Sequence, residues 1–463
     1  MVNYSAKFRT KDVNISIPDT VYSLESDLGP KELMNLIKTI LKEDNPSVDL
    51  ISDGKKLSFI VEGRLLRSTL IDHFKNVDEE EEPESNVISP EEKVLTIEYF
   101  ISQKSPKPIN SCSTDDWISC IDTNDEAIIN GCYDGVVNIW RFNKLDQVIS
   151  IPAHSSAIKD IKWIPSRQMI GFDNLTDDDY FFVTTSNDET VCLWKINLIA
   201  EKVEQIYLYK GHSRSVDCVD IQDGVFATGS YDKLLKIWAL FDKEKLSSGG
   251  DEKEEGENDS KKLKYNNTES GNNNNNDQSC KVKTPIMTLA DHTEAITDLT
   301  FIRDSNDTST AGHAPTIIVT CSMDNTMKLW DIELGKVDST FSGSKAFLSI
   351  SYSPLTKCLI SGSCDRHIRL WDPRSNEGSI VKTVFTSHQG WITSVNWSTT
   401  NENLFISGSY DSLVKQWDIR SCRGPIYDLI GHEDKVLTTD WTNSKYIISG
   451  SADKNLKIYE NEC

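Results

Sequence analysis

The stretch Ser407-Gly408-Ser409-Tyr410-Asp411-Ser412-Leu413-Val414-Lys415-Gln416-Trp417 decides the fold, because its pattern recurs along the chain. An aspartate stands six residues before an aromatic residue seven times. The pairs are Asp134/Trp140, Asp188/Trp194, Asp232/Trp238, Asp324/Trp330, Asp365/Trp371, Asp411/Trp417 and Asp453/Tyr459. Between the two positions apolar and polar residues alternate, which indicates a strand with one buried face. Each unit is therefore expected to hold a strand, a tight Asp turn and a second strand.

A histidine after a short turn precedes five of these units. The five are His154, His212, His292, His388 and His432, of the eight histidines in the chain. Each is followed by an apolar strand such as residues 295–301. This combination resembles the WD-repeat family, whose blades begin near Gly-His and end near Trp-Asp. The literal Trp-Asp stands at Trp330-Asp331, Trp371-Asp372 and Trp417-Asp418.

Seven units predict a seven-bladed WD-repeat β-propeller over residues 105–463. The aromatic positions are spaced by 54, 44, 92, 41, 46 and 42 residues, against a usual period of about 40 to 45. Only four residues follow Tyr459, so residues 108–112 are expected to cross over and complete the last blade, which removes its free edge. Residues 241–284 lack apolar periodicity, which predicts a disordered insertion.

A smaller domain is predicted for residues 1–101. Residues 6–10 and 13–17 alternate like a hairpin, with Val13, Ile15 and Ile17 on one face, and Pro30 opens an apolar-faced helix. Residues 57–61 and 94–101 read as strands, and residues 68–74 as a short helix. This order suits a ubiquitin-like β-grasp domain. The fold class is thus mainly β: a β-grasp domain followed by a propeller.

Composition excludes several classes of function. Lys and Arg number 49 against 72 Asp and Glu, a net charge of −23, which argues against strong direct binding to nucleic acid. The absence of an 18-residue apolar run and of a signal-peptide pattern predicts no membrane segment and an intracellular chain. Eleven cysteines without a C-x-x-C pair predict neither a disulfide framework nor a four-thiolate zinc site.

Ser, His and Asp recur together in most blades and invite comparison with a hydrolase. A nucleophilic triad, however, is a single constellation in a cleft and needs no repetition. Buried polar groups that recur must instead satisfy one another's hydrogen bonds. The WD-repeat resemblance implies the same, a structural network of His, Ser/Thr, Asp and Trp. We expect no catalytic residue and no cofactor of the chain's own.

Residues 59–70, Phe-Ile-Val-Glu-Gly-Arg-Leu-Leu-Arg-Ser-Thr-Leu, resemble the Notchless-like domain that precedes WD repeats in two ribosome assembly families. One is Notchless itself, with eight blades. The other is the Ytm-type WD-repeat subunit of the pescadillo/Bop complex, with seven. Seven units, and residues 110–117 leading directly into the first blade, favour the second family.

The resemblance implies a non-enzymatic assembly factor of the large (60S) ribosomal subunit, found in the nucleolus and nucleoplasm. In that family the propeller binds Bop, which sits with pescadillo on the pre-60S particle. The N-terminal domain presents a carboxylate to the metal-dependent adhesion site of the ATPase midasin. Midasin then strips the complex away, which supports rRNA maturation. The divalent ion, expected to be magnesium, belongs to midasin.

The family pattern places an acidic residue just before the last strand of the small domain, and that strand ends in Glu-Tyr. Residues 92–99, Glu-Lys-Val-Leu-Thr-Ile-Glu-Tyr, match it, which assigns the carboxylate to Glu92. The acidic run at residues 78–84 is a rival candidate for this carboxylate.

Two other classes of function stay open. A generic WD-repeat scaffold or ubiquitin-ligase substrate receptor needs only the propeller, and a propeller enzyme needs a unique titratable cluster in the central channel.

Overall fold

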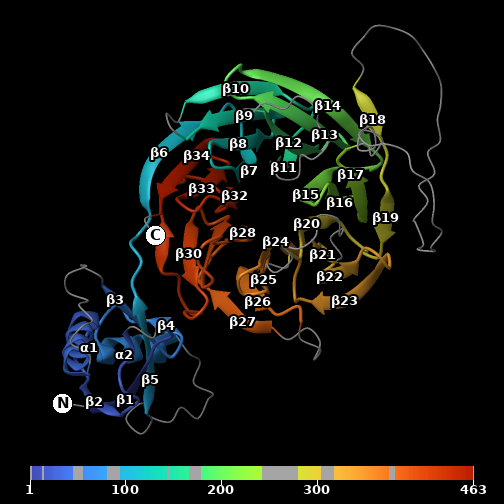
Figure 1. The fold of residues 1–463 in the computed structure, drawn as a ribbon. Helices are drawn as coiled ribbons and strands as arrows, with labels where there is room; N and C mark the ends of the chain where they lie inside the picture. The colour runs from blue at the N-terminus through green and yellow to red at the C-terminus, as the bar shows by residue number, and fades with distance from the viewer. Residues whose placement is uncertain are drawn as a thin grey trace, which may run out of the picture.

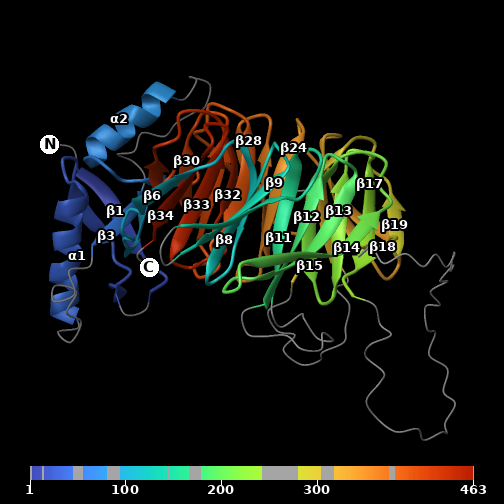
Figure 2. The same cartoon turned by 90° about the horizontal axis from the view of Figure 1, so that it is seen from above.

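The computed structural model describes residues 3–12, 15–44, 56–80, 94–142, 146–165, 179–241, 280–303, 317–374 and 381–461. A small domain stands beside a closed ring of β-sheets (Figure 1). Seen from above, it lies at one edge of that ring (Figure 2). None of the helices in these ranges has the length and apolar character needed to cross a membrane.

The small domain is a five-stranded sheet with two helices. Its strand order is β2 (Tyr22–Glu25), β1 (Asn3–Arg9), β5 (Leu95–Ile101), β3 (Leu57–Val61) and β4 (Arg64–Leu65). The helices are α1 (Pro30–Asp44) and α2 (Leu70–Glu80). Leu33, Ile37 and Leu41 recur at four-residue spacing, so they share one face of α1 and are buried in the core of the domain. The parallel pairing of β1 with β5 completes the predicted β-grasp arrangement.

The predicted hairpin partner of β1 is wrong. The antiparallel partner is β2, with Tyr4 opposite Leu24, and not residues 13–17. Ile15 and Ile17 are buried outside any strand, while Val13 lies outside the described residues. The Tyr99 hydroxyl donates to the Ile15 carbonyl at 2.6 Å and accepts the Ile17 N–H at 3.2 Å. One side chain thus satisfies backbone groups that a strand ladder would otherwise have paired.

Seven further sheets surround a central channel, and we number them blades 1 to 7 in chain order. The strands next to the channel are β7 (Ile118–Thr123), β11 (Ile158–Ile164), β15 (Val216–Gln222), β20 (Ile296–Phe301), β24 (Phe347–Ser353), β28 (Ile392–Trp397) and β32 (Val436–Asp440). The second strands are β8 (Ala127–Cys132), β12 (Asp179–Ser186), β16 (Val225–Ser230), β21 (Ile317–Ser322), β25 (Cys358–Ser363), β29 (Leu404–Ser409) and β33 (Tyr446–Ser451).

The third strands carry the aromatic residues of the repeat. They are β9 (Val136–Arg141), β13 (Thr190–Asn197), β17 (Leu234–Ala239), β22 (Thr326–Asp331), β26 (His367–Trp371), β30 (Val414–Asp418) and β34 (Asn455–Glu460). The outer strands are β10 (Gln147–Pro152), β14 (Lys202–Lys210), β19 (Met287–Ala290), β23 (Lys336–Ser342), β27 (Val381–Thr386), β31 (Tyr427–Leu429) and β6 (Lys107–Ser113). The seven-bladed propeller predicted from the sequence is therefore present.

The outer strand of blade 7 comes from the beginning of the propeller, as the sequence predicts. β6 pairs antiparallel with β34, with Cys112 opposite Leu456. The Thr114 N–H also donates to the Lys454 carbonyl at 2.8 Å. The ring is thus closed by chain segments more than 300 residues apart in sequence, and blade 7 has no free edge at β34.

The predicted disordered insertion at 241–284 is wrong at its C-terminal end. β18 (Lys281–Lys283) pairs parallel with the outer edge of β14, with Val282 opposite Leu208. The ammonium of Lys283 lies 3.8 Å from the ring centroid of Tyr207. An open strand edge offers unpaired backbone groups, and the tyrosine face holds the lysine. Residues 242–279 lie outside the described residues.

Candidate functional site

In five blades a histidine with a buried side chain lies between the turn aspartate and a hydroxyl of the second strand, and in four of them the same hydroxyl accepts the indole N–H of a tryptophan. In blade 6, His388 Nδ1 lies 2.7 Å from Asp411 Oδ2, and His388 Nε2 lies 2.7 Å from Ser407 Oγ. The same hydroxyl accepts the indole N–H of Trp417 at 2.8 Å. The corresponding pairs are His154 with Asp188, His212 with Asp232, His292 with Asp324 and His432 with Asp453. The indoles of Trp194, Trp238 and Trp330 donate to Thr184, Thr228 and Thr320.

Blades 1 and 5 hold their aspartate and tryptophan without a histidine ahead of the inner strand, although His367 Nδ1 of blade 5 lies 3.4 Å from Asp365 Oδ1. Trp140 donates to the Asn130 side chain at 2.7 Å, and Asp134 accepts the Val136 N–H at 3.0 Å. In blade 5, Trp371 donates to Ser361 at 2.8 Å, while Asp365 accepts from Arg369 at 3.1 Å. An arginine thus supplies to Asp365 the donors that histidine supplies elsewhere.

The protonation states in blade 6 follow from burial and hydrogen bonding. Burial lowers the pKa of the His388 imidazole, so the ring is neutral at pH 7. Burial alone raises the pKa of the Asp411 carboxyl, but the bonds from His388 and the backbone lower it to about 2. The proton of the neutral ring therefore lies on Nδ1 and is donated to Asp411. His388 Nε2 then accepts from Ser407.

These networks hold blades together rather than react with a substrate. Ser407 and His388 are both buried, and the hydroxyl proton already bonds the imidazole. The shared hydroxyl stands four residues before the aspartate, as Ser407 does in blade 6. A nearer serine stands only two residues before the aspartate. That nearer serine, Ser409 in blade 6, accepts the N–H of Asp411 at 3.2 Å and forms the turn.

A second set of polar side chains joins neighbouring blades around the channel. Asp122, Asp160, Asp220 and Asp298 accept the N–H groups of Trp163, Val219, Phe301 and Ile350. Ser349 and Ser394 accept those of Val395 and Thr439. Asp440 closes the circle by accepting the hydroxyl of Thr123 at 2.5 Å. We call these seven acceptors the channel ring. Each member ties the inner strand of one blade to that of the next.

Lys162 is a cation that lies among the carboxylates of the channel ring. Its ammonium lies 3.7 Å from Asp122, and its side chain is 34% exposed. Burial raises the pKa of Asp122 and of Asp160 to about 7, although Lys162 opposes this rise. Burial also lowers the pKa of the Lys162 ammonium, but the surrounding carboxylates more than offset this and hold it above its usual range. The carboxyls of Asp122 and Asp160 therefore depend on Lys162, whereas Asp220 is paired with Arg303 at 2.9 Å.

The small domain contacts the outer edge of blade 6. The Arg67 guanidinium donates to the carbonyl oxygens of Pro425 and Ile426 at 2.5 and 3.1 Å. The Tyr427 hydroxyl donates to the Gln103 carbonyl at 2.8 Å. The Arg420 guanidinium stacks on the Phe100 ring. Residues 102–106 form a short polar link between the domains, and these contacts fix the C-terminal end of β5 against the propeller.

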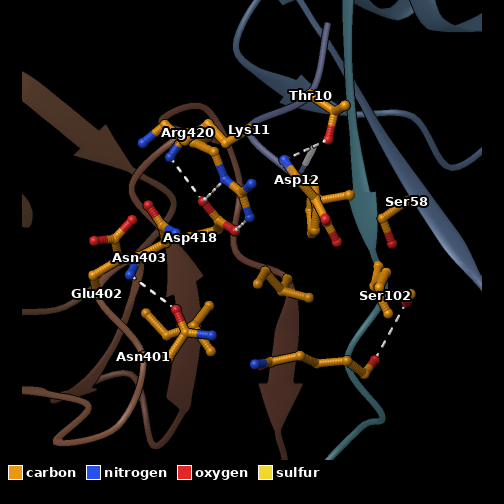
Figure 3. Close-up of a pocket in the computed structure, with 15 residues that line it drawn as sticks. Thr10, Lys11, Asp12, Ser58, Ser102, Asn401, Glu402, Asn403, Asp418 and Arg420 are labelled. Atoms are coloured by element: carbon orange, nitrogen blue, oxygen red, sulfur yellow. Dashed lines mark hydrogen bonds and ion pairs between the residues drawn. The ribbon is translucent and has the colours of Figure 1, made fainter. Parts of the chain in front are cut away.

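A cleft of about 220 Å³ lies along this contact. Thr10, Asp12 and Ser58 line it from the small domain, and Asn401 and Asp418 from blade 6 (Figure 3). Arg420 is paired with Asp418 across its wall. The polar groups of this wall bond one another, so the cleft belongs to the interface between the domains.

Glu92 and residues 81–84 of the rival acidic run lie outside the described residues, and nothing is described of the side chains at 78–80. The described chain resumes at Val94, next to the N-terminal end of β5. Among the described residues, no group of three or more His, Cys, Asp or Glu side chains is placed to hold a metal ion.

Comparison with known proteins supports the assignment of both domains. Residues 4–74 match the NLE (NUC135) domain. Six segments between residues 145 and 460 match the WD domain, G-beta repeat. The chain is 39% identical to the "Ribosome biogenesis protein WDR12 homolog" of Ixodes scapularis, covering 99% of this chain and 98% of the relative. It is 35% and 36% identical to the proteins so named in Anopheles gambiae and Aedes aegypti, covering 98% of this chain and 94% of each relative.

Proposed function

Because the chain belongs to the WDR12 family of ribosome biogenesis proteins, we propose that it links the pescadillo/Bop complex on the pre-60S particle to the ATPase midasin. It is a WD-repeat assembly factor and not an enzyme. The propeller binds Bop, and the small domain docks on midasin. ATP-driven remodelling by midasin then releases the complex in the nucleolus and nucleoplasm, which supports rRNA maturation.

The course of β5 carries this proposal. Its C-terminal end lies against the propeller, where Phe100 meets Arg420 and Gln103 meets Tyr427. A strand rises about 3.3 Å per residue, so the seven residues of β5 separate its two ends by about 20 Å. Glu92 precedes the end that points away from the propeller. The small domain can therefore bind midasin at the end of β5 that is far from the propeller, while the propeller binds Bop.

The proposed contact with midasin uses a carboxylate as a ligand in trans. A magnesium-like ion with one open position accepts a hard oxygen ligand. Glu92 supplies that oxygen together with a compensating charge. The carboxylate is this chain's only part in the metal site, and the pull exerted by midasin passes through β5 to the contacts of Arg67 and Arg420 on blade 6.

The test measures binding of the full chain to the adhesion domain of midasin, with and without a chelator. Glu92→Ala and Glu92→Gln should abolish metal-dependent binding, and Glu92→Asp should weaken it. Glu91→Ala is the matched control, because it removes the neighbouring carboxylate. All variants should still co-purify with Bop and pescadillo. If Glu92→Ala binds like the parent while neutralising residues 78–84 abolishes binding, the acidic run holds the ligand.

A scaffold or ubiquitin-ligase receptor that uses the propeller alone is less well supported. The similarity to the Ixodes relative covers the small domain as well as the blades. Affinity purification of the parent followed by protein identification separates the two. Recovery of pre-60S factors supports the assembly role, and recovery of ubiquitin-ligase subunits without them contradicts it.

A further inference from the structure

Each blade places two residues on the propeller face that carries the Asp turns. One residue directly precedes the inner strand, and the other directly precedes the turn aspartate. A backbone hydrogen bond joins them in every blade, as from Tyr410 N–H to the Trp391 carbonyl at 2.9 Å and from Tyr133 N–H to the Trp117 carbonyl at 3.0 Å. The fold therefore presents fourteen equivalent positions on this face, and their side chains are free to differ.

In blades 6 and 1 both of these positions are aromatic and exposed. Trp391 is 50% exposed and stacks on Tyr410, with ring centroids 5.5 Å apart. Trp117 is 44% exposed and meets Tyr133 edge-on at 5.6 Å. In blades 2 to 5, by contrast, the position before the inner strand is filled by Ala157, Ser215, Ala295 and Ala346. The fold does not require tryptophan there.

Two lysines complete a continuous surface across adjacent blades. Lys435 of blade 7 lies between the two aromatic pairs, with its ammonium 5.0 Å from the Tyr410 ring centroid. Lys159 of blade 2 lies 5.7 Å from the Tyr133 ring centroid. We define the aromatic arc as Trp391, Tyr410, Lys435, Trp117, Tyr133 and Lys159. Within the described part of the chain, neither lysine has a carboxylate within ion-pair distance.

We propose that the aromatic arc is the surface that binds the protein partner of the propeller, and that this partner presents an acidic segment with an apolar anchor side chain. Exposed Trp and Tyr combine a large apolar area with few torsions to freeze, and they dominate binding energy at protein interfaces. The anchor would fill the space beside Trp391 and Trp117. Its neighbouring carboxylates would pair with Lys435 and Lys159.

The groove beside the arc has a matching charge. It has a volume of about 650 Å³ and is lined by Arg64 of the small domain together with Arg366 and Arg423 of the propeller. Asp365 also lines it, but its carboxylate is paired with Arg369. Its wall includes Gln389, two residues before Trp391. These cations stand out in a chain of net charge −23. They extend the preference for carboxylates from the arc toward the small domain.

A folded protein fits the arc better than single-stranded RNA. Aromatic platforms with lysines also stack nucleic-acid bases, but such sites track a polyanionic backbone. Glu433 and Asp434 directly precede Lys435, and Asp217 acts on Lys159 through its charge. Isolated carboxylates of a protein segment can avoid these acids, whereas a continuous phosphate chain would be repelled.

This inference rests on the proposed binding of Bop, so purified Bop is the probe. We expect Trp391→Ala and Lys435→Glu in the full chain to weaken the affinity for Bop at least tenfold. Met323→Ala is the matched control for the tryptophan, because Met323 occupies the position before the turn aspartate in blade 4 and is 42% exposed. Lys336→Glu on the exposed outer strand of blade 4 is the control for the lysine.

Thermal midpoints within a degree of the parent would establish that the variants are folded. If the parent binds Bop and both arc variants bind as tightly as their controls, the inference is overturned while the proposed function stands. If the parent fails to bind Bop, the proposed function fails as well. If Trp391→Ala instead abolishes binding of a single-stranded RNA oligomer while Bop binding is unchanged, the arc is a nucleic-acid site and the proposed partner is wrong.

Discussion

The Arg420 guanidinium lies 3.8 Å from the centroid of the Phe100 ring, which joins the last strand of the small domain to blade 6. The same guanidinium is held from behind by Asp418, whose carboxylate accepts from Arg420 Nε at 2.8 Å. Asp418 is itself almost fully buried. An arginine fixed in this way is a rigid contact rather than a flexible surface side chain. The two domains therefore have a defined relative orientation.

Arg420→Ala should loosen that orientation. The lost stacking is expected to cost about 1 to 2 kcal/mol, because the guanidinium is mostly buried. We expect faster proteolysis in the 102–106 link and a larger maximum dimension in small-angle scattering. Arg374→Ala is the matched control, because Arg374 bonds Asp372 at the same spacing in blade 5 but is exposed. Equal proteolysis of both variants would show that Arg420 does not hold the domains together.

Asp411→Ala should destabilise the propeller by about 2 to 4 kcal/mol, because it leaves a buried imidazole without its acceptor. The difference in the free energy of unfolding between the parent and Asp411→Ala should also depend on pH. The folded-state pKa of His388 is below its ordinary value of 6.5. The parent's stabilisation from the neutral ring is therefore present above pH 6.5 and falls as pH drops below it.

Urea unfolding of parent and Asp411→Ala between pH 7.5 and 5 measures this dependence. The gap between the two midpoints should be smallest at pH 7.5 and widen on acidification, because the bond and the charge of Asp411 raise the pKa of His388, and without them the folded state resists protonation of the ring more strongly. A gap that stays constant or narrows between pH 7.5 and 5 would mean that Asp411 does not favour the protonated ring.

Substitution of two different tryptophans distinguishes an effect on stability from an effect on binding. Trp371 is completely buried, and its indole donates to Ser361 at 2.8 Å, so Trp371→Ala should cost about 3 to 5 kcal/mol. Trp391 is half exposed, so Trp391→Ala should leave the thermal midpoint almost unchanged. Calorimetry of the two variants side by side checks the contrast. Similar losses of stability would mean that Trp391 is part of the core and not of a binding surface.

The repeat predicted the blades well because the turn aspartate and the aromatic residue of the third strand occupy the same places in every unit. The ribosome biogenesis family predicted from residues 59–70 and the seven units is confirmed by full-length relatives. The binding of Bop and the docking of Glu92 on midasin remain predictions. The hairpin at 13–17 failed because alternating apolar residues do not specify what bonds the backbone, and here the distant Tyr99 does so.

The channel ring escaped sequence reasoning for a different reason. Asp122 stands four residues after the first residue of its inner strand, whereas Asp160 stands only two after the first residue of its own. No constant spacing marks the ring, and its partners lie in the next blade. Arg420 and Phe100 are likewise more than 300 residues apart. Contacts of this kind follow from the closed ring and the placement of the small domain, which local patterns do not encode.

Lys162→Met should destabilise the fold by about 1 to 2 kcal/mol, a value reduced for the partial exposure of the lysine to the channel. It should also make stability more sensitive to alkali. The folded-state pKa values of Asp122 and Asp160, about 7, exceed the ordinary carboxyl value, so these groups favour the fold only while protonated. That contribution is present below pH 3.8 and is lost as pH rises through 7. Without Lys162 the pKa values of Asp122 and Asp160 rise further, and the loss of stability at high pH grows.

Urea unfolding at pH 5.5 and pH 8 should therefore show that Lys162→Met loses more stability relative to the parent at pH 8. Lys195→Met, which removes a single ion pair with Asp179, is the control and should show little change with pH. Adding Asp122→Asn to Lys162→Met should recover part of the deficit at pH 8, because the amide still accepts the Trp163 N–H but carries no charge. A deficit that is independent of pH, or a double variant no better than the single one, would show that Lys162 does not offset the charge of the channel ring.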